Sequence, residues 1–305
     1  MPEFSVIVPV YNSEATLAEL FTRIKNCFDG IGASFEVIFV DDGSSDHSWQ
    51  LVTQLKNDFS QNIKAVRLIR NFGQHNAIFC GLHYATGNFF ITVDDDLQHA
   101  PEDIPKLIQK YEETKSELIY GCYERKSYHL FRNAGTRMIQ NATKSHYHTQ
   151  GDGSSFRMFT KHLGKRILEH TLDFVYIDEL LMWYTGDISY VSVQHKKRKS
   201  GKSGYTRIKL LRLTWNLIMY YTAIPLKLMV YVGLLISGLS FLLGIYYIIR
   251  KILFDVPHGY TSIIVAILFS TGLIVFSLGI IGGYLVRIYR AQHKKPAYAV
   301  KSELL

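Results

Sequence analysis

The chain has 305 residues, long enough for one sizeable domain plus extra elements, and shows no internal repeat, which excludes a repeat protein. Its formal net charge of +8 conceals two unlike parts. Residues 1–187 contain 18 Lys or Arg and 24 Asp or Glu, a net charge of −6. Residues 188–305 contain 16 basic residues and two acidic ones, a net charge of +14. The basic part therefore indicates an anionic partner, either nucleic acid or membrane phosphate.

Apolar runs alternate with helical patterns along the first part of the chain. The runs predict strands at Phe4–Val10, Phe35–Val40, Ala65–Ile69, Asn88–Val93 and Leu118–Gly121, with helices between them. Such alternation is typical of a parallel sheet with helices on both faces. Beyond about Tyr128 the pattern is less regular. It predicts helices at Leu130–Thr143, Lys161–His170 and Val175–Tyr184, and strands at Phe156–Phe159 and Ile188–Val193.

Two apolar stretches near the C-terminus each exceed the roughly 20 residues that span a bilayer. Residues 224–249 contain one charge, Lys227, and residues 262–286 contain none. Buried helices of a soluble domain are the alternative, but two such stretches joined by a short polar loop favour a transmembrane hairpin. The hairpin identifies the anionic partner as a membrane and excludes nucleic acid. Residues 206–222 mix apolar and basic side chains, which predicts an amphipathic helix in the headgroup layer, with a core helix as the alternative.

Basic residues flank the predicted hairpin on both outer sides. The loop between the two stretches has only Arg250 and Lys251, against Asp255. The positive-inside rule therefore places residues 1–205 and the tail 287–305 in the cytoplasm. The flanking basic residues are Lys196, Lys197, Arg198, Lys199, Lys202, Arg207, Lys209 and Arg212 before the hairpin and Arg287, Arg290, Lys294 and Lys295 after it.

Three consecutive carboxylates, Asp94, Asp95 and Asp96, directly follow the predicted Asn88–Val93 strand. At the carboxyl end of a parallel strand they lie where open α/β sheets bind ligands. One Asp before a helix is a common N-cap, but three exceed that role. Because crowded carboxylates repel one another, the pattern predicts a divalent cation with oxygen ligands, shared with a substrate phosphate.

Polar clusters also follow the first three predicted strands, and all four clusters should lie on one edge of a parallel sheet. Asp42 can accept a hydrogen bond from a ribose or base, and Arg70 can pair with a phosphate. Turn formation and surface solvation are the alternatives for these two residues. No glycine-rich phosphate loop of either common type is present, so phosphate binding should depend on metal and cations.

The order of these motifs resembles that of inverting GT-A glycosyltransferases acting on polyprenyl phosphate. This group includes bactoprenol glucosyltransferases, dolichol-phosphate mannose synthases and undecaprenyl-phosphate aminoarabinose transferases. The similarity continues through Arg198-x-x-Gly201-x-Ser203-x-Tyr205 and the hairpin, so it covers essentially the whole chain. The earlier motifs are Pro9-x-Tyr11-Asn12, Asp41-Asp-Gly-Ser-x-Asp46, Arg70-Asn-x-Gly-Gln74 and Asp94-x-Asp96-Leu-Gln98-x-x-Pro-Glu102.

The resemblance implies an α/β fold, a GT-A catalytic domain over residues 1–205 followed by a two-helix transmembrane hairpin. It also implies a multi-pass protein of the bacterial inner membrane that forms a homotetramer. Asp94 and Asp96 would hold Mg²⁺ or Mn²⁺, and Asp96, Arg125 and Arg157 would serve catalysis. The acceptor phosphate would contact Arg125, Arg198, Ser203 and Tyr205. The nucleotide would contact Pro9, Tyr11, Asn12, Asp41, Asp42, Arg70, Asn71, Gln74, Asp94, Asp95 and Gln98.

Ser155 stands where many members of this group have Asp. A hydroxyl acceptor needs a general base, whereas the oxygen of a phosphate monoester is already anionic. With a phosphate acceptor, the resemblance implies transfer of one sugar from a nucleoside diphosphate sugar, UDP-linked, to undecaprenyl phosphate with inversion, for O-antigen or another envelope glycan. A processive synthase, which usually has more spans and a Gln-x-x-Arg-Trp motif, and a non-catalytic nucleotide-binding scaffold are the alternatives.

Overall fold

The computed structural model describes residues 2–123, 154–169, 176–193, 260–292 and 296–305, together with isolated positions between 231 and 253. The chain forms two compact units. The first contains residues 1–131, 144–202 and 294–305, and the second contains residues 132–143 and 203–293. The chain therefore leaves the first unit and returns to it close to its C-terminus.

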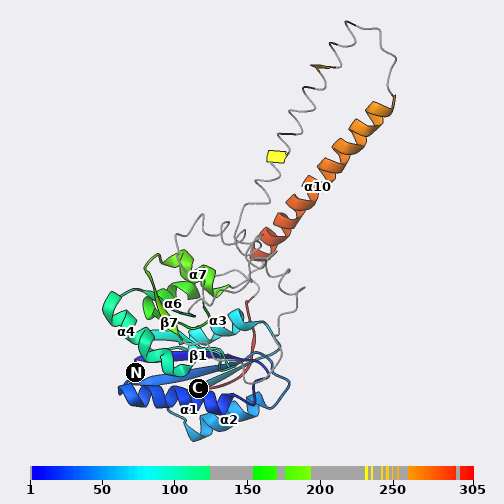
Figure 1. The fold of residues 1–305 in the computed structure, drawn as a ribbon. Coiled ribbons are helices and arrows are strands. Elements are labelled where there is room, and N and C mark those ends of the chain that lie inside the picture. The colour runs from blue at the N-terminus through cyan, green and yellow to red at the C-terminus, as the bar shows by residue number, and fades with distance from the viewer. Residues whose placement is uncertain are drawn as a thin grey trace. The chain divides into compact units, whose positions relative to one another are not determined.

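Strands and helices alternate through the described part of the first unit, as predicted (Figure 1). Its strands are β1 (Phe4–Val10), β2 (Phe35–Asp41), β3 (Ile63–Leu68), β4 (Phe89–Thr92), β5 (Leu118–Tyr123), β6 (Arg157–Thr160), β7 (Ile188–Val193) and β8 (Val300–Leu304). Its helices are α1 (Leu17–Ile31), α2 (Ser48–Asp58), α3 (Gln74–Tyr84), the 3₁₀ turn η1 (Pro101–Asp103), α4 (Ile104–Thr114), α6 (Lys161–Leu168) and α7 (Ile177–Tyr184).

The described strands form one twisted sheet in the order β7-β5-β6-β4-β1-β2-β3-β8. Strands β1 to β4 are parallel to one another, which brings their carboxyl ends to one edge. The prediction of a parallel sheet is correct for these four strands and also for β5 and β7, which pair in parallel. Strand β6 runs antiparallel to β4 and β5, and β8 runs antiparallel to β3. The sheet is therefore mixed.

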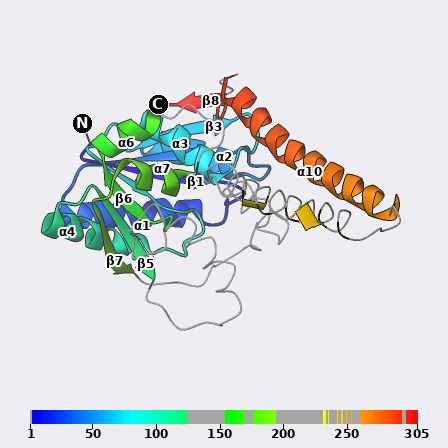
Figure 2. The same ribbon diagram turned by 90° about the horizontal axis from the view of Figure 1, so that it is seen from above.

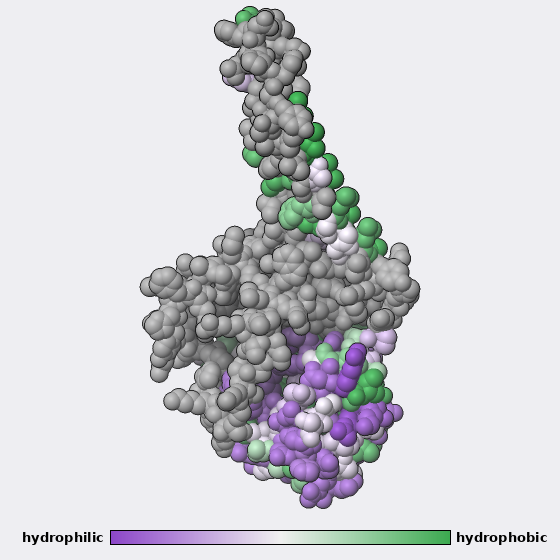
Figure 3. Space-filling model, turned by 90° about the vertical axis from the view of Figure 1, so that its right-hand side faces the viewer, coloured by the Kyte–Doolittle hydropathy of each residue, from purple (hydrophilic) through white to green (hydrophobic). Residues whose placement is uncertain are grey.

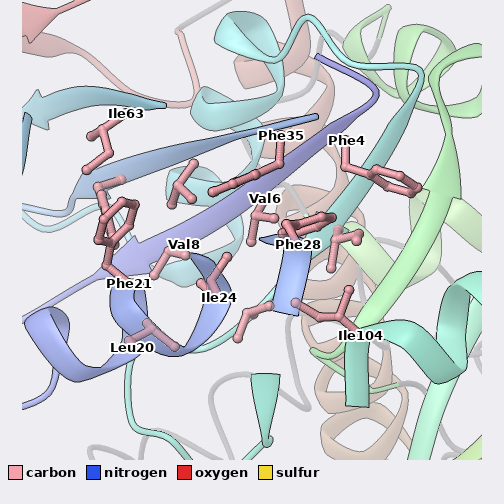
Figure 4. Close-up of a cluster of buried hydrophobic side chains, with 14 of the residues drawn as sticks. Phe4, Val6, Val8, Leu20, Phe21, Ile24, Phe28, Phe35, Ile63 and Ile104 are labelled. Atoms are coloured by element: carbon pink, nitrogen blue, oxygen red, sulfur yellow. The ribbon is translucent and has the colours of Figure 1, made fainter. Parts of the chain in front are cut away.

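Helices cover both faces of the sheet, so the central strands are buried on both sides (Figure 2). On one face Val6 and Val8 of β1 join a cluster with side chains of α1, α2 and α4 (Figure 4). On the other face Ile7 packs with side chains of α3, α6 and α7. Helix α1 buries Leu17, Leu20, Phe21, Ile24 and Phe28, the spacing of a one-sided amphipathic helix.

The predicted strands are confirmed, with end positions that differ by a few residues. The predicted helix Leu130–Thr143, the interfacial helix 206–222 and nearly all of the first predicted span, 224–249, lie outside the described residues. Strand β8 was not predicted, because residues 287–305 were expected to form only a tail.

The second unit contains α10 (Tyr260–Gln292), a continuous helix of 33 residues that includes the second predicted span. Its described apolar side chains are largely solvent-exposed and give α10 a mostly hydrophobic surface (Figure 3). They include Ile263, Ile267, Ile274, Phe276, Leu278, Leu285 and Ile288. Among the described residues, no helix satisfies both the length and the hydropathy of a membrane span. The two spans therefore stay predictions.

Candidate active site

The four predicted polar clusters meet at the carboxyl edge of the parallel strands. The loop after β1 contacts the loops after β2 and β4. The amide of Asn12 donates to Ser44 Oγ at 3.0 Å, and the amide of Tyr11 donates to Asp95 Oδ2 at 3.0 Å. These bonds join segments that are 32 and 84 residues apart in the chain, which supports the expectation that the clusters converge.

Asp42 joins the end of β2 to the loop between β3 and α3, which comprises residues 69–73 and is called the β3–α3 loop below. Its Oδ1 accepts a hydrogen bond from the Phe72 amide at 2.7 Å, and its Oδ2 accepts one from the Gly73 amide at 2.8 Å. The residue is 3% exposed. Burial raises the pKa of the Asp42 carboxyl to about 6, opposed by the two amide bonds and reinforced by Asp41.

Gly43 allows the same two loops to approach closely. Its φ of +68° lies in the left-handed region, and a Cβ at this position would lie 2.6 Å from the carbonyl carbon of Arg70. Both constraints favour glycine, because it lacks Cβ and adopts positive φ at little cost. The Asp-Gly pair therefore fixes the β3–α3 loop as well as forming a turn.

Asp41 stabilises the β2 turn from within. The residue is fully buried, and its Oδ1 accepts a hydrogen bond from the Ser44 amide at 3.0 Å. Its Oδ2 lies 3.0 Å from Arg67 Nε as an ion pair without the alignment of a hydrogen bond. The carboxylates of Asp41 and Asp42, which were predicted to contact the nucleotide, thus bond to other residues of the site.

Asp94 is partly buried at the end of β4 and is held by two neutral side chains. Gln74 Nε2 donates to its Oδ1 at 2.6 Å, and Ser155 Oγ donates to its Oδ2 at 2.6 Å. Burial, reinforced by the charges of Asp96 and Asp95 and opposed by the Ser155 hydrogen bond, raises the pKa of Asp94 to about 6. Ser155 therefore supplies a donor where an ionised Asp would add a further negative charge.

Asp95 and Asp96 make different contacts. Asp95 Oδ2 accepts hydrogen bonds from the Tyr11 amide and from Ser13 Oγ, which ties β4 to the β1 loop. Asp96 Oδ1 accepts one from the Gln98 amide at 3.0 Å within its own turn. Leu97, between Asp96 and Gln98, has a φ of +60°, a left-handed conformation that costs a non-glycine residue about 1 kcal/mol or more. Strain of this kind concentrates at functional turns.

The oxygen-rich edge fits a hard divalent cation. The fit rests on three adjacent carboxylates whose mutual repulsion contributes to the raised pKa of Asp94. Within the described residues, no three Asp, Glu, His or Cys side chains are already gathered as a complete metal site. Mg²⁺ commonly uses one or two carboxylates and completes its shell with substrate phosphates and water. Asp96 and Asp94 satisfy that smaller requirement.

Arg157, which was predicted to serve catalysis, is buried beneath this edge. It is 1% exposed and forms an ion pair with Asp178 of α7. Its Nε donates to Thr92 Oγ1 at 3.1 Å, and Thr92 Oγ1 donates to the carbonyl of Ser155. The guanidinium therefore supports the residue that binds Asp94.

Sequence reasoning missed Asp178. Its Oδ1 also accepts a hydrogen bond from Tyr120 at 3.0 Å, which anchors α7 to β5. The available signal was an acidic residue following Ile177 in the apolar segment Ile177–Tyr184. A partly buried acid of this kind needs a cationic or hydrogen-bonding partner.

The other predicted residues fall into two groups. Tyr11 is 49% exposed at the site edge, Pro9 lies in β1 opposite Val40, and the Arg70 guanidinium lies 4.9 Å from the Phe72 ring centroid. Asn71 is exposed and Gln98 is partly buried. Arg125, Arg198, Ser203 and Tyr205 lie outside the described residues.

Comparison with known proteins identifies this arrangement. Residues 5–172, more than half of the chain, match the family described as Glycosyl transferase family 2. The chain therefore belongs to glycosyl transferase family 2 and is a glycosyltransferase. Residues 224–288 match a second family, described as the GtrB C-terminal hairpin. The resemblance stated from the sequence motifs is confirmed.

Two relatives align over nearly the whole chain. The undecaprenyl-phosphate 4-deoxy-4-formamido-L-arabinose transferase of Yersinia pestis (strain Pestoides F) is 32% identical over an alignment of 305 residues. The alignment covers 97% of this chain and 92% of that protein. The transferase of the same name from Klebsiella pneumoniae (strain 342) is 29% identical over 302 residues, with the same two coverages.

A solved structure shares the fold at low identity. Glucosyl-3-phosphoglycerate synthase from Mycobacterium tuberculosis, crystallised with Mn²⁺, UDP and phosphoglyceric acid, has a TM-score of 0.53 and 18% identity. The match covers 72% of this chain and 76% of the synthase. This likeness confirms the GT-A α/β fold of the catalytic part.

Proposed function

We propose that the protein transfers one sugar from a UDP-sugar to undecaprenyl phosphate, or a related polyprenyl phosphate, with inversion at the anomeric carbon. The main support is the meeting of four polar loops at the carboxyl edge, together with full-length relatives named as undecaprenyl-phosphate sugar transferases.

The donor diphosphate is proposed to lie beside Asp96, over the edge formed by the ends of β1, β2 and β4. Asp96 and Asp94 would hold Mg²⁺ or Mn²⁺, which when bound stabilises the negative charge of the departing nucleoside diphosphate. Gln74 and Ser155 keep the Asp94 carboxylate oriented through their two 2.6 Å hydrogen bonds. Tyr11, exposed at the edge, is a candidate to contact the base.

The acceptor is proposed to be a phosphate because the site supplies no acid at position 155. Ser155 Oγ donates to Asp94, so this side chain acts as a donor and not as a base. A phosphate monoester oxygen is anionic at neutral pH and attacks without losing a proton. Catalysis then depends on positioning and on charge stabilisation. Arg125, Arg198, Ser203 and Tyr205 are proposed to bind the acceptor phosphate.

A membrane location agrees with a lipid acceptor. The hairpin family matches residues 224–288, and residues 144–202 before it and 294–305 after it belong to the same compact unit. A chain that leaves a folded unit and returns to it must cross a bilayer an even number of times. We propose that residues 224–249 and 262–286 are the two crossings and that the catalytic domain faces the cytoplasm.

Labelling of single cysteines in a cysteine-free background tests this topology. A cysteine replacing Gly259 should react with an impermeant thiol reagent in intact cells. A cysteine replacing the exposed Lys301 should react only after the membrane is permeabilised. The reverse pattern would place the catalytic domain outside and contradict the use of cytosolic nucleotide sugars.

Transfer of label from a panel of UDP- and GDP-sugars into an undecaprenyl-phosphate extract tests the proposed reaction. Transfer from one UDP-sugar to a chloroform-soluble product, abolished in Asp96→Ala, is the expected result. Label that enters a long polymer instead of a single-sugar lipid would favour a processive synthase.

A further inference from the structure

The C-terminal segment, residues 296–305, belongs to the same folded unit as the catalytic edge. Its strand β8 pairs antiparallel with β3, with Ala65 opposite Leu304 and Arg67 opposite Ser302. Without β8, strand β3 would be an open sheet edge. The pairing shifts register between Arg67 and Leu68, and Leu304 packs against one core cluster and Val300 against the other.

The pairing reaches the start of the β3–α3 loop. The last contact along this edge is a hydrogen bond of 3.0 Å from the Ile69 amide to the Ala299 carbonyl. The next residue along the loop is Arg70, and two and three residues beyond it Phe72 and Gly73 donate their amides to Asp42. The loop is therefore held by Ala299 at one end and by Asp42 at the other.

The C-terminal segment also contacts the helix that follows the loop. Tyr298 Oη lies 3.0 Å from His83 Nδ1, and the Tyr298 ring packs edge-on against Phe79, 6.3 Å between centroids. Tyr84 Oη donates to Glu303 Oε2 at 2.7 Å. Helix α3, which carries all three partners, begins at Gln74, whose side chain donates to Asp94.

We propose that the C-terminal segment is a positioning element of the donor site, holding the β3–α3 loop and α3 in the arrangement that receives the nucleotide diphosphate. The element lies beyond the hairpin in sequence, so nucleotide binding depends on residues that follow the predicted membrane segment. The inference rests on the proposed function, because it assigns the loop to donor binding. A purely structural role for β8 would instead protect the sheet edge without affecting that loop.

Three full-length or nearly full-length proteins in detergent or nanodiscs test the proposal. The first ends at Lys295 and lacks the whole segment. The second carries Tyr298→Ala, which removes the contacts to His83 and Phe79. The control carries Lys301→Ala, a substitution at an exposed position of β8. UDP with Mn²⁺ serves as the ligand, and calorimetry measures its Kd.

We expect the truncation to raise the Kd for UDP by about tenfold or more and to raise the donor KM, while the acceptor KM changes less than twofold. Amide hydrogen exchange at Ile69, Phe72 and Gly73 should speed up, with that of β5 unchanged. A synthetic peptide of residues 296–305 added to the truncated protein should restore part of both effects by strand addition. Tyr298→Ala should also raise the Kd for UDP and speed up amide exchange in the β3–α3 loop. Lys301→Ala should change neither quantity.

A folded truncated protein that keeps the wild-type Kd and the wild-type exchange of the β3–α3 loop would overturn the proposal. If the truncation does not fold, Tyr298→Ala decides by the same two readouts, with wild-type values in both counting against the inference. Failure of the wild-type protein to bind UDP would overturn the proposed donor. The exchange measurement needs no ligand and would still decide the positioning role.

Discussion

The ends of β2 and β4 each carry a carboxylate whose pKa is raised to about 6, but the two are held differently. Asp42 accepts hydrogen bonds from two backbone amides of the β3–α3 loop. Asp94 accepts its two bonds from the side chains of Gln74 and Ser155. Backbone donors can be supplied by any residue, whereas side-chain donors depend on residue identity. The β2 end is therefore set by loop geometry, and the β4 end can be changed by single substitutions.

The largest effect is expected at the β4 end from Asp96→Ala. Removing a carboxylate that holds the metal on the diphosphate should cost about 4 kcal/mol of transition-state stabilisation, or roughly a thousandfold in kcat/KM. EDTA should abolish transfer by the wild-type protein, and Mg²⁺ or Mn²⁺ should restore it. The variant should stay inactive at any metal concentration. Full turnover by Asp96→Ala would remove this residue from the metal site.

The ion pair beneath the β4 end should dominate stability. Asp178→Asn leaves the buried Arg157 guanidinium without its charged partner, which typically costs about 3–5 kcal/mol. Urea unfolding followed by circular dichroism should show that loss. Glu179→Gln on the same helix should show much less, because no ion pair joins Glu179 to Arg157. Equal losses in the two variants would mean that Arg157 does not depend on Asp178.

The pH dependence of stability should report His75, the neighbour of Gln74. Burial lowers the pKa of its imidazole to about 4, and Arg157 lowers it too, against the opposite effect of Asp178. The unfolded chain, with an ordinary pKa near 6.5, then binds more protons than the folded protein between about pH 6.5 and 4. Stability should therefore fall as pH decreases through this window, by at most about 3 kcal/mol.

His75→Gln provides the control for this pH effect, because Gln can still accept the hydrogen bond from the Ile177 amide. The difference in unfolding free energy between the two proteins should change with pH only below about pH 6.5. A pH-independent difference would contradict the lowered pKa.

Asp42→Asn tests the β2 end. The amide keeps the size of the side chain but replaces one of the two charged acceptors of the β3–α3 loop, a loss of about 2 kcal/mol. We expect the Kd for UDP to rise about 30-fold. Asp58→Asn, at the end of α2, is a matched control and should leave this Kd unchanged. An unchanged Kd in Asp42→Asn would show that the loop keeps its binding conformation without this carboxylate.

The smallest effect is expected from Ser155→Ala, which removes one neutral donor to Asp94 at a cost of about 1 kcal/mol, or roughly fivefold in kcat/KM. Ser155→Thr should retain most activity because it keeps the hydroxyl. Ser155→Asp should be worse than Ser155→Ala, since a second carboxylate would face Asp94. Higher activity in Ser155→Asp would indicate that the acceptor needs a base and would argue against a phosphate.

Sequence periodicity was sufficient to predict β1 to β5 and the four polar clusters, because buried strands and the turns after them have local signatures. It could not predict the antiparallel direction of β6 or the pairing of β8, which depend on contacts between distant segments. The same limit applies to Asp42 and Arg157. Asp42 was predicted to contact the nucleotide, and Arg157 was predicted to serve catalysis. Residue type alone does not reveal that Phe72, Gly73 and Asp178 would bond them in the folded chain.

The central claim is tested most directly by comparing two acceptors that differ only in the phosphate. The wild-type protein is incubated with its preferred UDP-sugar, Mn²⁺ and either undecaprenyl phosphate or undecaprenol, and the lipid products are identified by mass spectrometry and NMR. The account predicts a glycosyl phosphodiester of inverted anomeric configuration from undecaprenyl phosphate and no product from undecaprenol. Transfer to undecaprenol, or a phosphodiester with retained configuration, would contradict it.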